Sequence, residues 1–129
     1  MKAIIDTHVF LWWISDHAQF SRLAKEFMRS PENEPLLSAA SLWEMVYKQK
    51  AGLLHFPEPA GKFLAQQVAK NRFGILPIEG RHALALANLP DHHRDPFDRI
   101  LIAQSLVEKL PIVSADVNLK PYDVEILWD

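Results

Sequence analysis

Apolar runs alternate with chain breakers along the sequence, and the lengths of the runs predict alternating strands and helices. Short apolar runs bounded by turn residues are typical of buried strands, whereas longer segments with apolar positions three and four apart are typical of helices. The clearest helix follows Pro96, because Ile100, Ala103, Val107 and Leu110 keep a 3-4-3 spacing. The pattern predicts strands at residues 2–5, 36–37, 74–77, 111–114 and 124–127. It predicts helices at residues 9–14, 21–30, 40–51, 57–71, 79–89 and 96–108, with a turn at 31–35.

Strands that alternate with helices indicate a mostly parallel sheet covered on both faces. We therefore expect an α/β fold with three α/β/α layers and a central sheet of about four to five strands. Residues 9–14 are apolar throughout, so periodicity does not separate helix from buried strand there. The N-cap chemistry of Asp6 and Thr7 favours a helix. A chain of 129 residues fits one domain, spanning 1–129, with one core.

Composition narrows the class of protein. Hydrophobic residues make up 49% of the chain and charged residues 23%, which is typical of a soluble globular protein. The absence of cysteine excludes disulfides and thiolate zinc sites. The start, MKAIIDTHVF, does not resemble a signal peptide, and no run approaches the roughly 18 apolar residues of a membrane span. We expect a cytoplasmic protein without a membrane partner.

The net charge of −2 argues against a nucleic-acid binder that acts mainly through charge, since such proteins are usually strongly basic. This argument weakens if several acids form one metal site, because bound cations reverse the local field.

Four carboxylates stand beside short apolar segments: Asp6 in AIIDTH, Glu44 in SLWEM, Asp98 in DPFDRILIAQS and Asp116 in IVSAD. An α/β fold gathers the loops after its strands at one edge of the sheet. A cluster of carboxylates repels itself unless cations neutralise it, and hard divalent cations are the usual partners of all-oxygen sites. The pattern therefore predicts a Mg²⁺ or Mn²⁺ site and metal-assisted phosphoryl chemistry.

Each of these acids also has a purely structural interpretation. Asp6 suits a helix N-cap, and Asp116 suits a turn. Glu44 can form an i,i+4 ion pair with Lys48, and the local sequence favours solvent exposure for that pair.

The segment around Asp95 and Asp98 resembles a capped helix start, with Asp95 as N-cap and Pro96 at the first helical position. Asp98 is the better metal ligand, because a capping carboxylate is already bonded to backbone N–H groups. Asp95 stays a weaker candidate ligand.

Five neighbours of these acids are candidates for substrate contact: Thr7, Lys48, Arg94, Arg99 and Ser114. The arginines can bind phosphate or simply balance charge. Thr7 and Ser114 can cap a helix or hold a water near the site.

The six histidines and four tryptophans give weaker signals. No HExxH or similar spacing is present, and the adjacent His92 and His93 would not share a face of a helix or strand, so the sequence disfavours a histidine metal site. The tryptophans, with the apolar segment 9–14, predict either core packing or a partner surface.

Four blocks carry a family resemblance: IIDTHVFLWW, LSAASLWEMVYKQKAG, HHRDPFDRILIAQSL and IVSADVNLKPYDVEILW. In this order and spacing they resemble the PIN-domain ribonucleases, and more narrowly the VapC toxins of bacterial toxin–antitoxin operons. The resemblance implies a PIN-like parallel sheet and an acidic pocket for Mg²⁺ or Mn²⁺, with Asp6, Glu44, Asp98 and Asp116 as the catalytic acids. It makes residues 9–14 helical and turns Glu44 inward.

The resemblance further implies a metal-dependent endoribonuclease that cuts RNA such as tRNA or rRNA, a cognate antitoxin as partner and a homodimer. Two alternatives stay open at this stage. One is a PIN-like module that binds RNA or a partner without cutting it. The other is a phospho-acceptor receiver domain, which is disfavoured because Asp6 is followed by Thr7 and His8 instead of a second acid.

Overall fold

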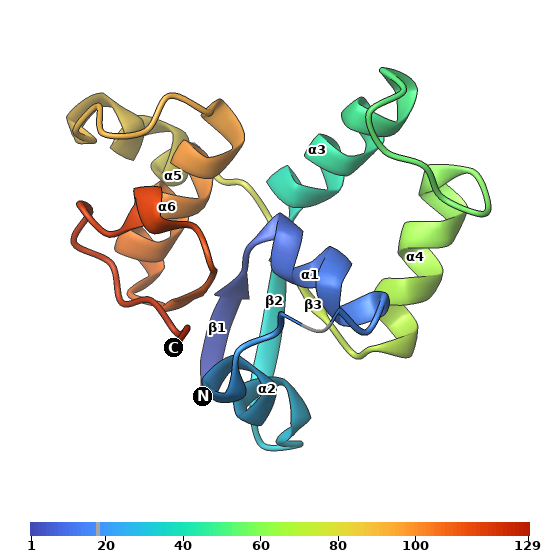
Figure 1. Cartoon of the computed structure of the whole chain (residues 1–129). Coiled ribbons are helices and arrows are strands. Elements are labelled where there is room, and N and C mark those ends of the chain that lie inside the picture. The colour runs from blue at the N-terminus through green and yellow to red at the C-terminus, as the bar shows by residue number, and fades with distance from the viewer. Residues whose placement is uncertain (18) are drawn as a thin grey trace.

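A sheet of four parallel strands forms the centre of the molecule, which is described for residues 1–17 and 19–129 by a computed structural model (Figure 1). The strands are β1 (Lys2–Ile5), β2 (Glu34–Ser38), β3 (Gly74–Leu76) and β4 (Ile112–Val113). Their spatial order is β3-β2-β1-β4. The chain therefore moves outward from β1 to β3 and then returns to the other side of β1. This reversal creates a topological switch point between β1 and β4, where open α/β sheets form their crevice.

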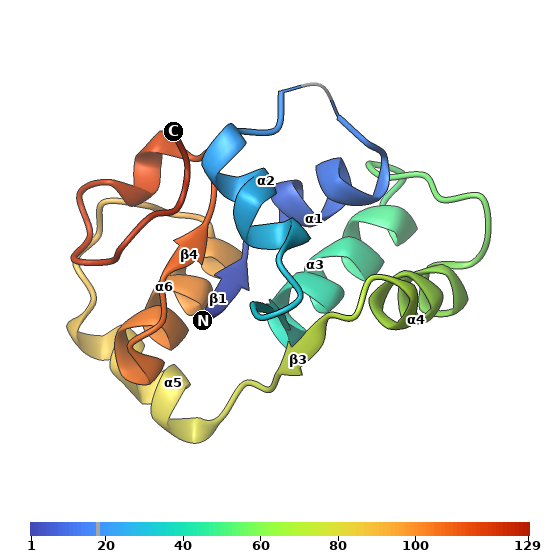
Figure 2. The ribbon, with the colours of Figure 1, turned by 90° about the horizontal axis from the view of Figure 1, so that it is seen from below.

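Helices cover both faces of the sheet, as the sequence pattern predicts (Figure 2). They are α1 (Thr7–Ile14), α2 (Arg22–Arg29), α3 (Ala39–Lys50), α4 (Ala60–Lys70), α5 (Gly80–Ala85) and α6 (Pro96–Glu108), with short 3-10 helices η1 (Leu86–Asn88) and η2 (Val117–Leu119). Helices α1, α2 and α4 pack on one face, and α5 and α6 pack on the other. The three-layer α/β/α architecture is confirmed.

The side-chain alternation of β1 divides the core into two halves. Ala3 and Ile5 pack into the cluster beneath α1 and α2, whereas Ile4 packs into the cluster beneath α6. All three residues are fully buried. A strand that is apolar on both faces requires helices on both sides, so β1 holds the two layers together and positions its carboxyl end, at Asp6, in the middle of the molecule.

Local capping explains where several helices begin and end. The Ser21 hydroxyl accepts a hydrogen bond from Ala24 N at 3.0 Å, and Asp95 caps α6, which begins at Pro96. After α3 the chain turns at Gly52, whose φ of +76° is readily adopted only by glycine. These ends agree with the predicted ones to within a residue or two.

The predicted fifth strand at 124–127 is wrong, because this segment forms only an isolated bridge between Ile126 and Ile112. The turn predicted at 31–35 is also too long, since Glu34 and Pro35 belong to β2. Pro35 is tolerated there because β3 joins β2 only from Leu36 onward.

Two predicted helices are shorter than expected. Helix α4 begins at Ala60, after Pro59, and not at residue 57, because a residue that precedes proline is pushed out of the helical conformation. The helix predicted at 79–89 is α5 followed by the 3-10 turn η1.

The apolar segment 9–14 belongs mainly to the core. Val9 and Phe10 are fully buried, and Trp12 and Trp13 are partly buried against the same cluster. Trp43, by contrast, has 62% of its surface exposed.

Within the described part of the chain, no helix is both long and apolar enough to cross a membrane.

Candidate active site

Asp6 occupies the switch point because β1 ends directly before it. Its residue is only 2% exposed, and both carboxylate oxygens are hydrogen-bonded. Oδ1 accepts from Thr7 N at 2.8 Å, and Oδ2 accepts from the Ser114 hydroxyl at 2.7 Å. The sequence-based N-cap interpretation is confirmed, because Oδ1 caps α1, whereas Oδ2 faces the end of β4 and the ligand role of Asp6 stays a prediction.

Ser114 links the ends of two neighbouring strands. It follows β4, which pairs in parallel with β1, so its side chain lies beside Asp6 across the sheet. Its hydroxyl oxygen also accepts a hydrogen bond from Asp116 N at 3.0 Å. Asp116 in turn caps η2, since its Oδ1 accepts from Asn118 N at 2.9 Å. Ser114 thereby sets the relative position of two predicted catalytic acids.

Glu44 points inward from α3 and is 5% exposed. Its Oε1 accepts from the Thr7 hydroxyl at 2.7 Å, and its Oε2 lies 2.7 Å from Lys48 Nζ. The solvent exposure favoured by the local sequence is wrong, and the inward orientation implied by the family resemblance is confirmed. The i,i+4 pair with Lys48 does exist, and its hydrogen bond to Glu44 raises the pKa of Lys48.

At the start of α6, Asp95 caps the helix and Asp98 does not. Asp95 Oδ1 accepts from Phe97 N at 2.9 Å and from Asp98 N at 3.3 Å. Asp98, in the first turn of the helix, is left to face the other acids. The predicted N-cap role of Asp95 is confirmed, and the ligand role of Asp98 stays a prediction.

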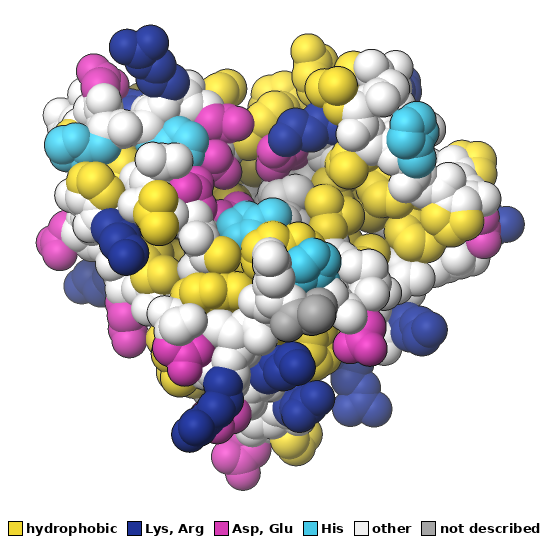
Figure 3. Space-filling view, in the orientation of Figure 1, with side chains coloured by type: hydrophobic (Ala, Val, Ile, Leu, Met, Phe, Trp, Pro, Cys, Tyr) yellow, Lys and Arg dark blue, Asp and Glu magenta, His cyan; other side chains and the backbone are white. Residues whose placement is uncertain are grey.

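The acids from these separate elements converge on one cleft of about 420 Å³. Figure 3 shows acidic side chains gathered around this hollow, between the α6 side and the α3 side of the molecule. The lining includes five acids and, within the described residues, one lysine: Asp6, Glu44, Asp95, Asp98, Asp116 and Lys48. The convergence predicted from the sequence is thus present, whereas the chemistry of the cleft stays a proposal.

Burial and neighbouring charges raise the pKa of two of these acids. Burial, reinforced by the charges of Asp6 and Asp95, raises the pKa of Asp98 to about 7. Burial likewise raises the pKa of Asp6, although His8 and the Ser114 hydroxyl oppose this effect. Two neighbouring carboxyl groups therefore resist ionisation together unless a cation joins them.

The donor set fits a hard divalent cation. Carboxylate oxygens dominate the cleft, as in protein sites for Mg²⁺ and Mn²⁺. The raised pKa of Asp98, caused first by burial and then by the charges of Asp6 and Asp95, is the second indication, because a bound cation would offset both effects.

The two arginines proposed for substrate contact are placed differently. Arg99 does not line the cleft: its guanidinium donates to the backbone oxygens of Leu89, Pro90 and His93 at 3.0–3.3 Å and lies 3.3 Å from Asp91. Arg94 is exposed and is also outside the cleft lining.

Two histidines for which the sequence predicts no role, His8 and His93, lie beside the acids. His8 Nε2 accepts from Ala115 N at 3.0 Å, and His8 Nδ1 lies 3.6 Å from Asp6 Oδ2. His93 Nε2 lies 3.0 Å from Asp98 Oδ2 and 3.2 Å from Asp116 Oδ2. The adjacency of His8 to Asp6 is a signal that could have been used, but the position of His93 depends on a loop that local sequence does not describe.

The fold and the acidic cleft agree with the comparison with known proteins. Residues 3–125 match the family model described as PIN domain. The chain belongs to the PIN-domain family. Membership in this family excludes the alternative of a phospho-acceptor receiver domain. No curated protein matches the chain.

Solved structures of low sequence identity share this PIN-domain fold. VapBC2 from Rickettsia felis, bound to a DNA fragment from its promoter, is 14% identical with a TM-score of 0.74, and the match covers 100% of both chains. VapBC-1 from nontypeable Haemophilus influenzae is 12% identical with a TM-score of 0.70, over 98% of this chain and 96% of that one. VapBC-5 of Mycobacterium tuberculosis, from a family of toxin–antitoxin systems, is 19% identical with a TM-score of 0.63, over 99% and 98%. At such identities the likeness concerns the fold.

Proposed function

We propose that this PIN domain is a Mg²⁺- or Mn²⁺-dependent endoribonuclease that acts as the toxin of a toxin–antitoxin pair. The observation that carries the proposal is the convergence of Asp6, Glu44, Asp98 and Asp116 on one cleft at the switch point of the sheet. The pKa of Asp98, raised by burial and by the charges of Asp6 and Asp95, supports it, because strongly shifted carboxyl groups gather at functional sites.

Asp6, Asp98 and Asp116 would hold the cation, and Asp95 would contribute less because Oδ1 already caps α6. A bound magnesium or manganese ion supplies Lewis acidity, which eases proton loss from water and offsets charge that develops on a phosphate. Ser114 keeps Asp6 directed into the cleft. No nucleophilic side chain is needed for this hydrolysis.

Glu44 would orient the attacking water. Its two oxygens are held by Thr7 and Lys48, so the carboxylate has one defined orientation at the edge of the cleft. Lys48, with 38% of its side chain exposed, would add a contact to a substrate phosphate. Arg94, exposed next to the cap of α6, stays a proposed contact with more distant phosphates.

RNA is the proposed substrate, with structured tRNA or rRNA as the expected targets, because the SAASLWE and DPFDR-ILIAQ blocks resemble those of PIN-domain ribonucleases. Structured RNA is recognised through its shape and through unpaired bases in loops and ends.

The test is cleavage of total tRNA and rRNA by the wild type and by Asp6→Asn, each with Mn²⁺, with Mg²⁺ and with EDTA. We expect cleavage only for the wild type with a cation. Asp123→Asn is a matched control, because Asp123 is exposed and lies outside the cleft. Equal cleavage by wild type and Asp6→Asn would refute the mechanism. RNA binding by the wild type without any cleavage would instead support the non-catalytic module.

An antitoxin partner is part of the proposal, supported by the shared fold with proteins of three VapBC structures. We further propose a homodimer in the cytoplasm. Co-expression with the product of an adjacent short gene, followed by purification and light scattering, tests both: the expected result is a stable complex in which RNA cleavage is suppressed. A chain that elutes as a monomer would refute the dimer.

A further inference from the structure

We propose that His93 is a positioning residue that holds Asp98 and Asp116 in a preformed arrangement for the cation, donating a hydrogen bond to them and not binding the metal itself. The inference rests on the proposed function of the cleft, since it assigns a residue to the same cation site.

The contacts of His93 place one nitrogen between two acids from different elements. Nε2 lies 3.0 Å from Oδ2 of Asp98, on α6, and 3.2 Å from Oδ2 of Asp116, which follows β4. The potential ligand atoms of the three residues all lie within 4.8 Å of one another. Two carboxylates at this separation repel each other, and a shared N–H donor offsets that repulsion.

The hydrogen bond of the other ring nitrogen, Nδ1, indicates whether Nε2 is a hydrogen-bond donor or a metal ligand. The backbone N–H of Asp95 donates to His93 Nδ1 at 3.2 Å, so Nδ1 accepts and the proton of the neutral ring resides on Nε2. A metal bound at Nε2 would force the proton onto Nδ1, where it would face the Asp95 N–H. The geometry therefore points to Nε2 as a hydrogen-bond donor to the two acids.

The loop that carries His93 is fixed by contacts from outside the cleft. His93 N donates to the Tyr122 hydroxyl at 2.8 Å, and that hydroxyl donates to Pro90 O at 2.8 Å. Arg99 donates to His93 O at 3.2 Å. The His93 ring is thus held in place by hydrogen bonds to its residue's backbone and to Nδ1. A residue that sets the spacing of two acids must be fixed in this way. Arg99, proposed from the sequence as a substrate contact, supports this loop.

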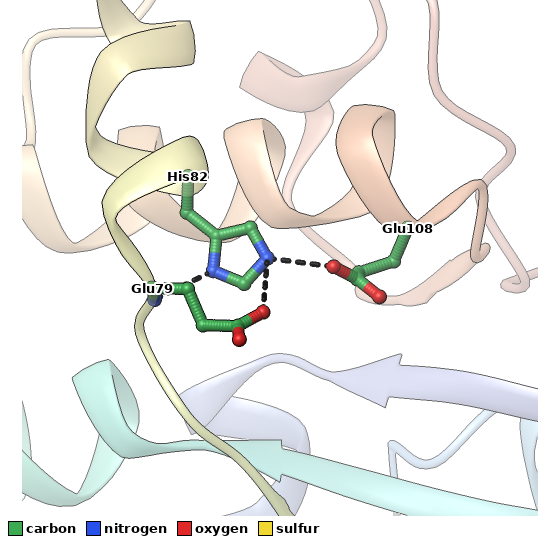
Figure 4. Close-up of side chains that lie close together, drawn as sticks. All are labelled: Glu79, His82 and Glu108. Atoms are coloured by element: carbon green, nitrogen blue, oxygen red, sulfur yellow. Dashed lines mark hydrogen bonds and ion pairs between the residues drawn. The ribbon is translucent and has the colours of Figure 1, made fainter.

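His82 provides a matched control, because it makes the same pair of contacts elsewhere (Figure 4). Its Nδ1 accepts from Glu79 N at 2.9 Å, and its Nε2 lies 2.8 Å from Glu108 Oε2. This group joins α5 to α6 and lies outside the acidic cleft. A substitution there removes a histidine with similar hydrogen bonds without touching the proposed cation site.

The experiment measures Mn²⁺ binding to the whole chain by the electron paramagnetic resonance signal of free Mn²⁺. We expect His93→Ala to weaken Mn²⁺ affinity by about tenfold or more, as is typical for partners that orient metal ligands. His93→Gln, which keeps an N–H donor at a similar reach, should bind within about threefold of wild type on the same reasoning. His82→Gln should bind Mn²⁺ like the wild type.

Pulsed resonance on wild-type protein with bound Mn²⁺ and ¹⁵N-labelled histidine needs no variant, so it stays decisive if His93→Ala fails to fold. The expected spectrum lacks the coupling of a directly bound histidine nitrogen. A directly bound nitrogen, or wild-type affinity in folded His93→Ala, overturns the role of His93 alone, provided that the wild type binds Mn²⁺ and cleaves RNA. Absence of Mn²⁺ binding by the wild type overturns this inference together with the proposed function.

Discussion

The Thr7 hydroxyl donates to Glu44 Oε1 at 2.7 Å, although 37 positions separate the two residues. The bond joins the first turn of α1 to the middle of α3 and turns Glu44 toward the acids that follow β1 and β4. Thr7 also contacts the Ser41 hydroxyl at 2.9 Å, so the bond lies in a buried polar network. Removing the Thr7 hydroxyl should therefore change the orientation of Glu44 while leaving the fold intact.

Thr7→Val keeps the shape of the side chain but removes this donor. We expect RNA cleavage to slow by at least about tenfold, and the free energy of unfolding to fall by about 1–2 kcal/mol, because a buried acceptor loses its partner. Steady-state cleavage and urea denaturation measure the two effects. Thr7→Ser, which retains the hydroxyl, is the control. A Thr7→Val protein that cuts RNA at the wild-type rate would show that the orientation of Glu44 does not matter.

Without a divalent cation, stability should decrease as the pH rises. The pKa of Asp98 is raised from 3.8 to about 7, so the folded state binds more protons than the unfolded state between these values. The contribution is fully present below pH 3.8 and is lost as the pH rises through about 7. Urea denaturation in EDTA at pH 5, 6, 7 and 8 measures this loss.

Asp98→Asn provides the control for that pH dependence. The amide does not ionise, so this variant should lose much of the decline and should exceed the wild type in stability above about pH 7, where the wild-type carboxylate is charged. A wild type whose stability is flat or rises from pH 5 to 8 would contradict the raised pKa.

Divalent cations should stabilise the wild type and not the site variants. A ligand that binds only the folded state at about 100 times its dissociation constant adds about 2.7 kcal/mol. We expect Mn²⁺ to raise the melting temperature of the wild type and of Asp123→Asn, and EDTA to reverse the rise. Asp6→Asn and Asp98→Asn should respond weakly or not at all. An equal shift in all four proteins would indicate cation binding outside the cleft.

His82 should be important for stability and unimportant for catalysis. Its side chain is fully buried and joins Glu79 to Glu108, so His82→Gln should cost about 2 kcal/mol through imperfectly replaced hydrogen bonds. Denaturation and RNA cleavage, measured on the same preparation well below the melting temperature, separate the two properties. A stable but inactive His82→Gln protein would contradict this division.

Lys109 offers a substitution that should stabilise the protein. It ends α6 in the left-handed conformation, with φ 56° and ψ 49°. Glycine adopts this conformation without strain, so Lys109→Gly should add about 1 kcal/mol to the free energy of unfolding. Thermal denaturation measures the gain, and a lower melting temperature would show that the lysine side chain contributes more than the strain costs.

Most of the fold could be predicted from the sequence because local signals and the global topology agree. Asp95, Pro96 and Asp98 mark the start of α6 with capping chemistry that needs no tertiary information. The strand predicted at 124–127 is wrong because the apolar pattern suits a strand, while the single bridge to Ile112 depends on how the chain returns along β4.

Part of the site could be predicted from the sequence for the same reason. Asp6 and Asp116 follow short apolar strands, so their convergence follows from parallel pairing alone. Glu44 could not be placed by periodicity, because its direction is set by Thr7 from another helix. The position of His93 could not be predicted from the sequence, because Tyr122, 29 positions away, holds its loop in place. Local sequence patterns predict helices and strands well, whereas contacts between loops that are distant in the sequence can be found only in the structure.

The bond between Ser114 and Asp6 spans 108 positions, and this has a consequence for synthesis of the protein. A chain still emerging from the ribosome holds β1 and α3 long before β4 exists to pair with β1. The two sides of the cleft cannot meet until translation is almost finished, so an unfinished chain does not hold the complete set of acids in one place. Fragments released early would lack the last acid as well as the strand that presents it.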